Sequence, residues 1–388
     1  MSRERTAEGA WRGVRRALQT VHLWLGLALC IPIVVIGISG SALLVQSDYV
    51  RRSFPPATAA GPRQPIMRAI EVAQAAGPAN ARLGRADLAL REGDPVTVQM
   101  QPPGRRVRPV KIYVDPVSLK VLGSEEVVPR GEALGFLIRI HAFLTMKSYI
   151  GAKVVGWLGV VMTLMGVSGL VLWWPRRGQW RRAFFVRRGA RGLALNLDLH
   201  HAAGIWTLAV FLIMSVSGVY LSFPQTATNA VLAVLPSGLG SGEPRAGFVP
   251  TPGPLDADMA VASAVRAVPD ARAVGVQMPE QAGRPIVVFL ESTRVGDATQ
   301  PQILVMFNQA TGNARYVDDP RYHGTAERTI NLLNALHYGA PFGLLWQATV
   351  FVSGFLPLFF AVTGFNIWWA RRRVSRRVAK AARVAPAE

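Results

Sequence analysis

Four long apolar stretches interrupt an otherwise mixed pattern of hydrophobic and polar residues. They cover residues 21–45, 152–174, 200–223 and 346–369. Roughly 20 consecutive apolar residues are enough to cross a bilayer as a helix, so each stretch predicts one membrane-spanning helix. The first stretch could instead belong to a cleaved signal peptide, because it follows a basic lead. Its length, well beyond the apolar part of a signal peptide, and its similarity to the third stretch favour a span.

Two long polar segments, 46–130 and 224–325, separate the spans of each half and are expected to form α+β domains outside the membrane. Each has a helical pattern followed by the alternation typical of strands, the second after a Pro- and Gly-rich linker. The predicted helices are 65–76 and 255–268, and the predicted strands are 96–101, 109–115, 272–278, 285–291 and 302–308. Interfacial helices are predicted over 131–151 and 326–345, just before the second and fourth spans.

Positive charge is concentrated in the short segments that flank the spans. Residues 1–20, 175–199 and 370–388 hold 19 of the 43 lysines and arginines, at about three times the density of the long connections. This bias is typical of the cytoplasmic side, so both termini and the middle loop are expected there. The net charge of +20 is explained by topology and by contact with anionic lipid, and no nucleic-acid partner is expected. The N-terminal lead is expected to be poorly ordered.

The second half of the chain repeats the order of the first. Seventeen residues separate His22 from Ser39 in the first span, and seventeen separate His200 from Ser217 in the third. A parallel duplication of span, outer domain and span accounts for this agreement. The expected fold is therefore a membrane α-helical bundle of four transmembrane helices with two outer α+β domains and an internal duplication.

Four of the six histidines occupy equivalent places in the two halves. His22 and His200 begin outward-going helices, so both are expected at the cytoplasmic edge of the membrane. His141 and His337 precede inward-going helices, so both are expected at the outer edge. Each edge then receives two imidazoles, which is what bis-histidine ligation of a haem iron requires. We predict these four residues as the iron ligands of two haem groups.

Cysteine usage restricts the type of haem. Cys30 is the only cysteine, so the chain has no C-x-x-C-H motif for covalent attachment. Two haem b groups held by side chains alone are therefore expected. No nucleotide-binding glycine loop or catalytic triad is visible, and no residue is predicted to act as an acid–base catalyst.

The remaining two histidines receive different predictions. His201 competes with His200, but the four-residue spacing to the next glycine, which His22 shares, favours His200 as the ligand. We expect His201 to pack nearby or to hydrogen-bond a haem propionate. His323 has no counterpart in the other half and is interpreted as a surface loop residue, with a substrate-side role as the alternative.

Small residues and two arginines complete the set of candidates. Small-residue motifs at equivalent places in the spans favour ordinary close packing of helices, with admission of a flat macrocycle as the alternative. They lie at 37–40, 166–169, 215–218 and, in a weaker form, 363–364. We hypothesise that Arg139 and Arg328, near the outer pair, contact haem propionates, because arginine suits bidentate contacts with carboxylates.

Four motifs around the ends of the spans carry a resemblance to a known family. They are VHLWLGL from Val21, LVLWWPRR from Leu170, LHHAAGIW from Leu199 and WWARRR from Trp368. The chain resembles the PepSY-associated transmembrane family, and its outer segments resemble PepSY domains. The family includes iron-regulated membrane proteins and ferric-siderophore reductases of the bacterial inner membrane. The resemblance implies two b-type haems and reduction of a ferric chelate in the periplasm, although His201 stands where the family often has arginine.

Three functions compete at this point. The favoured one is an oxidoreductase that moves electrons from an unidentified cytoplasmic or membrane donor to a ferric siderophore or other ferric chelate. The alternative is a membrane-anchored binding or regulatory protein without redox activity, which leaves the paired histidines unexplained. A transporter is suggested by the repeat, but the spans lack Asp, Glu, Lys and Arg in their interiors.

Overall fold

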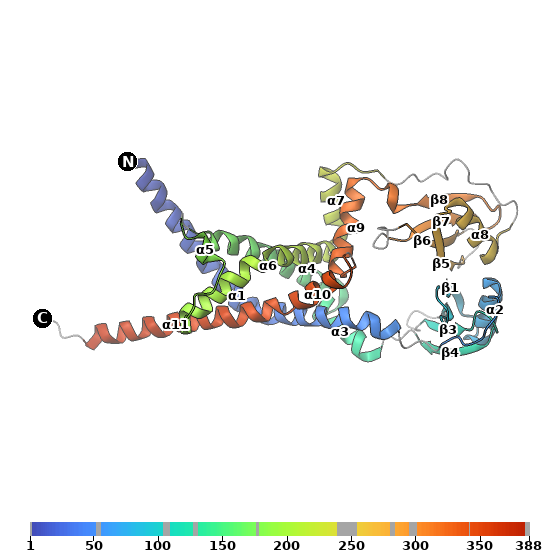
Figure 1. Ribbon diagram of the computed structural model, residues 1–388, viewed down its shortest axis with the longest axis horizontal. Helices are drawn as coiled ribbons and strands as arrows, with labels where there is room; N and C mark the ends of the chain where they lie inside the picture. The colour runs from blue at the N-terminus through green and yellow to red at the C-terminus, as the bar shows by residue number, and fades with distance from the viewer. Residues whose placement is uncertain are drawn as a thin grey trace. The chain divides into compact units, whose positions relative to one another are not determined.

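The computed structural model describes the chain in nine segments, which fall into two compact units (Figure 1). The described residues are 2–51, 56–103, 109–126, 131–175, 178–238, 254–279, 284–294, 301–340 and 342–384. The helical unit is built from parts of 1–45, 136–227 and 336–388. The sheet unit is built from parts of 46–135 and 228–335.

Four regions of the helical unit are long and apolar enough to cross a membrane. They are Trp11–Val45 in helix α1 (Ser2–Arg51), Ser148–Trp173 as helix α4, Gly192–Ser222 as helix α6, and Gly343–Arg377, which combines α10 (Gly343–Ser353) with most of α11 (Leu356–Val384). Helix α6 packs against α4, α10 and α11. The shorter helices are α3 (Gly131–Phe143), α5 (Trp180–Ala183), α7 (Pro224–Val234) and α9 (Thr325–His337).

The basic lead is helical, and the prediction of a poorly ordered segment over residues 1–20 is wrong. Helix α1 begins at Ser2 and continues without a break into the first span. The lead is rich in Arg and Ala, which are strong helix formers, and it contains no proline. A helix that already exists in the membrane needs no new nucleus, so extending it by such residues costs little.

The fourth span is two helices rather than the single helix predicted over 346–369. The break between α10 and α11 falls at Gly354, just before Pro357, whose ring nitrogen has no proton to donate. The Ser41 hydroxyl of α1 donates to the Phe351 carbonyl at 2.6 Å. That contact satisfies a backbone group that the break leaves without its helical partner, as the interior of a membrane requires.

The sheet unit is one antiparallel sheet of eight strands in the order β4-β3-β2-β1-β5-β6-β7-β8. Its strands are β1 (Arg82–Asp87), β2 (Val96–Gln101), β3 (Val110–Val114), β4 (Val121–Glu126), β5 (Ala271–Gln277), β6 (Ile286–Ser292), β7 (Ile303–Phe307) and β8 (Ala314–Asp318). Strands β1 and β5 pair with Ala86 opposite Val276, which joins the two outer segments in the middle of the sheet. The outer segments therefore form one unit, which corrects the prediction of two separate domains.

One hydrophobic core serves both halves of this sheet. Helices α2 (Ile66–Ala76) and α8 (Ala257–Ala267) place Ile70 and Ala264 against it, and both side chains are fully buried. The carboxylate of Asp258 in α8 accepts hydrogen bonds from the backbone N–H groups of Ile66 and Met67, at 2.7 and 2.9 Å. The first turn of α2 is thus capped from the other half of the chain, which links the halves by a polar contact as well as by apolar burial.

Three strands, β1, β4 and β8, and two α-helices, α5 and α7, appear where no regular structure was predicted. Strand β1 contains three charged residues and a glycine, and β8 is short, so neither shows the alternation of a half-buried strand. Helix α7 begins at Pro224, inside the predicted linker, where proline suits the first turn of a helix. Pairing in the sheet, rather than local pattern, makes β1 a strand, because it lies between β2 and β5.

Candidate functional site: two histidine pairs between helices

Helix α3 carries His141 and turns back sharply into α4. Leu144 and Thr145 have φ values of 48° and 63°, which end the helix after Phe143 and reverse the chain. Gly151 of α4 lies so close to Phe143 that a β-carbon there would overlap the Phe143 carbonyl. The close approach brings the histidine beside α1 instead of leaving it beyond the end of α4.

Helix α9 carries His337 and reaches α10 through a comparable turn. Gly339 and Phe342 have φ values of 73° and 60°, in the left-handed region. The indole nitrogen of Trp346 in α10 donates to the carbonyl of Leu336 at 3.0 Å, which occupies a terminal carbonyl of α9. The end of α9 is thereby held against the start of α10.

The hydrogen bonds of His141 define which ring nitrogen is protonated. Its Nδ1 lies 2.8 Å from the carbonyl oxygen of Ile36 and 3.4 Å from the hydroxyl of Ser39, both in α1. A carbonyl oxygen can only accept, so Nδ1 carries the proton and donates it. The other nitrogen, Nε2, then keeps its lone pair, which is the form in which imidazole binds a metal.

The other three histidines make the same contact with a hydroxyl on a neighbouring helix. The distances from Nδ1 to the hydroxyl oxygen are 2.8 Å for His22 and Ser168, 2.8 Å for His200 and Thr363, and 2.9 Å for His337 and Ser217. Each hydroxyl also donates its single proton to a carbonyl of its own helix, over 2.7 to 3.1 Å. It must therefore accept from an Nδ1–H group, and Nε2 of each imidazole again keeps its lone pair.

The residue after each hydroxyl is a glycine that faces the same imidazole. A β-carbon at Gly169, Gly218 or Gly364 would stand 3.6, 3.6 or 3.8 Å from the Cε1 atom of the ring. A β-carbon at Gly40 would stand only 2.7 Å from Cε1 of His141. The Ser-Gly or Thr-Gly pair thus holds the ring from two sides, by a hydrogen bond and by a flat contact surface.

His141 from the first half of the chain lies next to His337 from the second half. The ring centroids of His141 and His337 are 6.2 Å apart, with the planes tilted by 49°. Two imidazoles that bind one metal ion through Nε2 at about 2 Å place their centroids roughly 6 Å apart. Within the described residues, no three His, Cys, Asp or Glu side chains gather to form a metal site. Each pair could therefore supply two ligands to a metal ion, and no more.

His22 and His200 line a cavity of about 480 Å³ inside the helical unit. Its wall comes from α1, α4, α6 and α11 and is predominantly apolar. Gly26 and Gly204, the glycines four residues after these histidines, both line it and leave room in the wall. A cavity of this size and lining suits an organic molecule that is mostly apolar.

Two arginines that the sequence analysis did not single out also line this cavity. They are Arg15 in α1 and Arg371 in α11, and His201 lines it with them. His201 is thus close to the predicted ligand His200, as expected for a supporting residue. The two arginines were missed because they lie in the basic segments, where a cluster of positive charge is already explained by topology.

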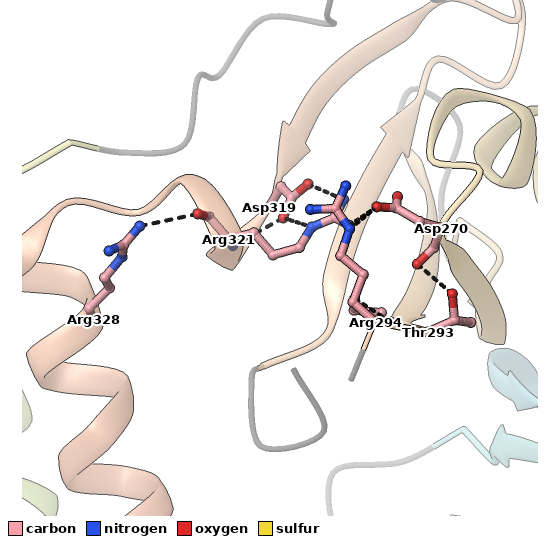
Figure 2. Close-up of polar contacts among 7 residues, drawn as sticks. Asp270, Thr293, Arg294, Asp319, Arg321 and Arg328 are labelled. Carbon is pink, nitrogen blue, oxygen red and sulfur yellow. Dashed lines mark hydrogen bonds and ion pairs between the residues drawn. The ribbon is translucent and has the colours of Figure 1, made fainter. Parts of the chain in front are cut away.

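The structure does not bring the two predicted propionate contacts to the histidines. Arg139 is exposed and leaves α3 about 200° around the helix from His141, two residues later. Arg328 lies nine residues before His337 in α9. Its guanidinium donates to the carbonyl of Arg321 at 3.2 Å (Figure 2). Neither arginine contacts the histidine pair among the described residues, and their role toward propionates stays a prediction.

His323 belongs to a polar network of the sheet unit. Its Nε2 donates to Asp318 at 2.6 Å, and its Nδ1 accepts from Asn331 at 3.2 Å, so both ring nitrogens are engaged. Nearby, Arg321 forms an ion pair with Asp270 at 2.8 Å (Figure 2) and lowers the pKa of that carboxyl. These contacts favour the structural interpretation of His323 over a role toward substrate.

The Ser-Gly and Thr-Gly pairs contact the histidines, and sequence reasoning missed these contacts. Close helix packing was the favoured explanation for the small-residue motifs, and Gly37 and Gly166 do pack closely against neighbouring helices. The Ser-Gly or Thr-Gly pair of each motif lies against a histidine as well. One signal in the sequence pointed to these contacts, because the hydroxyl residue and the histidine recur at the same spacing in both halves. Which hydroxyl serves which histidine follows only from the packing of the helices.

Four apolar helical regions, together with an antiparallel sheet unit, define the class of this chain as a multi-pass membrane protein. The family model for the PepSY-associated TM region matches residues 19–371. The match covers most of the chain, and the chain therefore belongs to this family. A comparison with curated proteins found no match.

Proposed function

We propose that this protein is a di-haem b electron-transfer protein that reduces a ferric chelate, such as a ferric siderophore. In the proposal His22 and His200 hold one haem and His141 and His337 hold the other. The protein would lie in the bacterial inner membrane, with both termini in the cytoplasm and the sheet unit in the periplasm. Bound haem would supply one-electron redox chemistry at each pair.

One observation carries this proposal: the Nδ1 atom of each of the four imidazoles lies within hydrogen-bonding distance of an oxygen on a neighbouring helix, which leaves Nε2 as the nitrogen that can bind a metal. Metal-bound histidines in proteins almost always donate their other ring N–H to an oxygen, which fixes the tautomer and the ring orientation. Each of the four histidines has such a contact with a hydroxyl oxygen. A bilayer anchor has no need of four such contacts, and a duplicated pair of ligand helices explains them.

The positions of the pairs suit transfer across an apolar layer. Along α1, His22 precedes Ser39, the partner of His141, by 17 residues, which is about 25 Å of helix. The cavity at the first pair extends along α1 from Arg15 to Ile33, so its deep end approaches the second pair. The two sites are thus arranged in series within one bundle, with apolar side chains between them.

The proposed acceptor follows from the chemistry of iron chelates. Hard oxygen ligands prefer Fe(III), and adding one electron to give Fe(II) weakens the chelate and releases the metal. The protein then has to position the electron-transfer groups and the chelate, and needs no acid or base of its own. The donor on the cytoplasmic or membrane side is a separate partner.

The rival function is a membrane-anchored binding or regulatory protein without redox activity. The large sheet unit favours it, because a sheet of eight strands is more than an electron conduit needs. This rival gives no reason for the hydroxyl contacts of the four histidines. Haem content separates the two functions.

The test is a reduced-minus-oxidised spectrum of the wild type against His22→Ala and His337→Ala, with His323→Ala as the matched control. We expect about two b-type haems in the wild type and in the control, and about one in each of the other variants. Mixing the reduced wild type with a ferric hydroxamate should oxidise the haem and release Fe(II). Equal haem content in all four proteins would reject the ligand assignment, and haem-free protein from haem-replete cells would favour the rival.

A further inference from the structure

The cavity at the first histidine pair has a cationic end. Arg15 and Gln19 of α1, His201 of α6 and Arg371 of α11 line it. Among the described residues of its wall there is no aspartate or glutamate. Arg371, Gln19 and His201 are exposed and Arg15 is half-buried, so the positive charge lies at the open mouth of the cavity. An apolar cavity with positive charge at its mouth complements a ligand that is apolar over most of its area and anionic at one edge.

Each arginine lies two helical turns from a residue of the first histidine site. Arg15 precedes His22 by seven residues on α1, and Arg371 follows Gly364, the contact of His200, by seven residues on α11. Seven residues are two turns, so each arginine lies on the same face of its helix as the histidine site, about 10 Å along the axis. The cationic edge and the two imidazoles therefore face one ligand from different positions.

Among the described residues, Arg15 makes a hydrogen bond to a backbone carbonyl and no ion pair. One of its nitrogens donates to the carbonyl of Leu172 near the end of α4, at 2.6 Å, which holds the side chain in place. A guanidinium has five donor hydrogens in a planar fork that suits a carboxylate. The acidic residue Asp198 of α6 is bound by Arg187 at 2.8 and 2.9 Å, so that acid is already neutralised.

We infer that Arg15 and Arg371 clamp the carboxylates of the macrocycle held between His22 and His200, with His201 and Gln19 beside them. This inference rests on the proposed function and adds to it the direction in which the haem points. The two propionates face the end of the helical unit formed by the basic lead and the start of the basic tail. No arginine was predicted from the sequence for this pair, because Arg139 and Arg328 were predicted for the outer pair.

The experiment compares haem b with its dimethyl ester, which lacks both carboxylates. The full-length His337→Ala protein is purified from haem-starved cells, so that only the first site remains, and is titrated with each compound. We expect haem b to bind at least roughly tenfold more tightly than the ester, since charge-assisted hydrogen bonds are lost with the ester. Adding Arg15→Ala and Arg371→Ala should remove this preference, and lysine at both positions should restore part of it.

Arg376→Ala, on the same helix as Arg371 but outside the cavity wall, is the control and should keep the full preference. The double alanine variant with His337 intact should retain the haem at the second pair, which shows that it is folded. Equal binding of haem b and ester without the arginine changes, or an unchanged preference with them, would overturn the clamp and leave the proposed function standing. Failure of the wild type to bind haem at either pair would overturn both.

Discussion

At the scale of single residues, the site depends on hydroxyl groups that are ordinary in sequence. Serine and threonine inside a membrane helix usually donate to a carbonyl one turn earlier, as these do. That bond uses the only proton of the hydroxyl and leaves its lone pairs for an imidazole N–H. The orientation of the ligand is therefore set by a residue that does not touch the proposed metal.

Removing one of these hydroxyls should weaken the haem site without abolishing it. Ser217→Ala deletes the acceptor of His337 Nδ1–H, and we expect a loss of haem affinity at the second pair of roughly 10- to 100-fold. Ser353→Ala is the matched control, because that hydroxyl bonds only within its own helix at Val350. Titration of the haem-free proteins with haem b measures the effect, and identical affinities would show that the hydroxyl has no positioning role.

The four glycines beside the imidazoles should differ in their tolerance of a methyl group. At Gly40 a β-carbon would stand 2.7 Å from His141, so Gly40→Ala should displace the ring and cost the second haem. At Gly364 the corresponding distance is 3.8 Å, which is ordinary contact, so Gly364→Ala should keep the first haem. Haem content per protein distinguishes these outcomes, and equal loss in both variants would contradict the contact geometry.

At the scale of elements, the break between α10 and α11 lets the fourth span approach α1. A β-carbon at Gly37 would overlap the carbonyl of Gly354, and one at Gly354 would overlap the hydroxyl of Ser41. These contacts lie next to Ser39 and Gly40, which hold His141. The break and the second histidine pair thus depend on the same stretch of α1.

Gly354→Ala should therefore affect both stability and the second site. Overpacking of a tight contact typically costs about 1–3 kcal/mol, and here the strain falls on the α1 residues that support His141. We expect a lower thermal midpoint of the purified protein and reduced haem at the second pair, with the first pair retained. Gly13→Ala, at a position with open space around the β-carbon, is the control and should change neither. A variant as stable as the wild type would show that the helices can separate without cost.

At the scale of the whole molecule, two segments far apart in sequence share one sheet and one core. The first segment contributes α2 to this core and the second contributes α8. A core built from one segment alone would be small, and small cores bury too little apolar surface to be stable. Sharing the core between α2 and α8 solves this problem. The cap that Asp258 provides to α2 makes the two segments cooperate.

Asp258→Ala should destabilise helix α2, which belongs to the first outer segment, although Asp258 itself lies in the second. Loss of a helix cap typically costs about 1 kcal/mol, so amide hydrogen exchange in the first turn of α2 should accelerate several-fold. Asp256→Ala removes a cap of the same kind from α8 itself, at Met259, and should leave the α2 amides unchanged. Faster exchange in α2 in both variants would mean that the cap acts through general stability of the unit.

The sequence by itself determined the four spans, most strands and the identity of the four paired histidines. Each of these follows from periodicity, apolar length or a spacing that recurs in both halves, and such signals depend on local chemistry along the chain. Only the tertiary structure decided that the outer segments share a sheet, that the fourth span breaks, and that Arg15 and Arg371 line the cavity of the first histidine pair. The physical reason is that these features arise where helices and strands from distant parts of the chain meet. A hydroxyl such as Ser168 has the same local environment in any membrane helix until His22 of another helix lies against it.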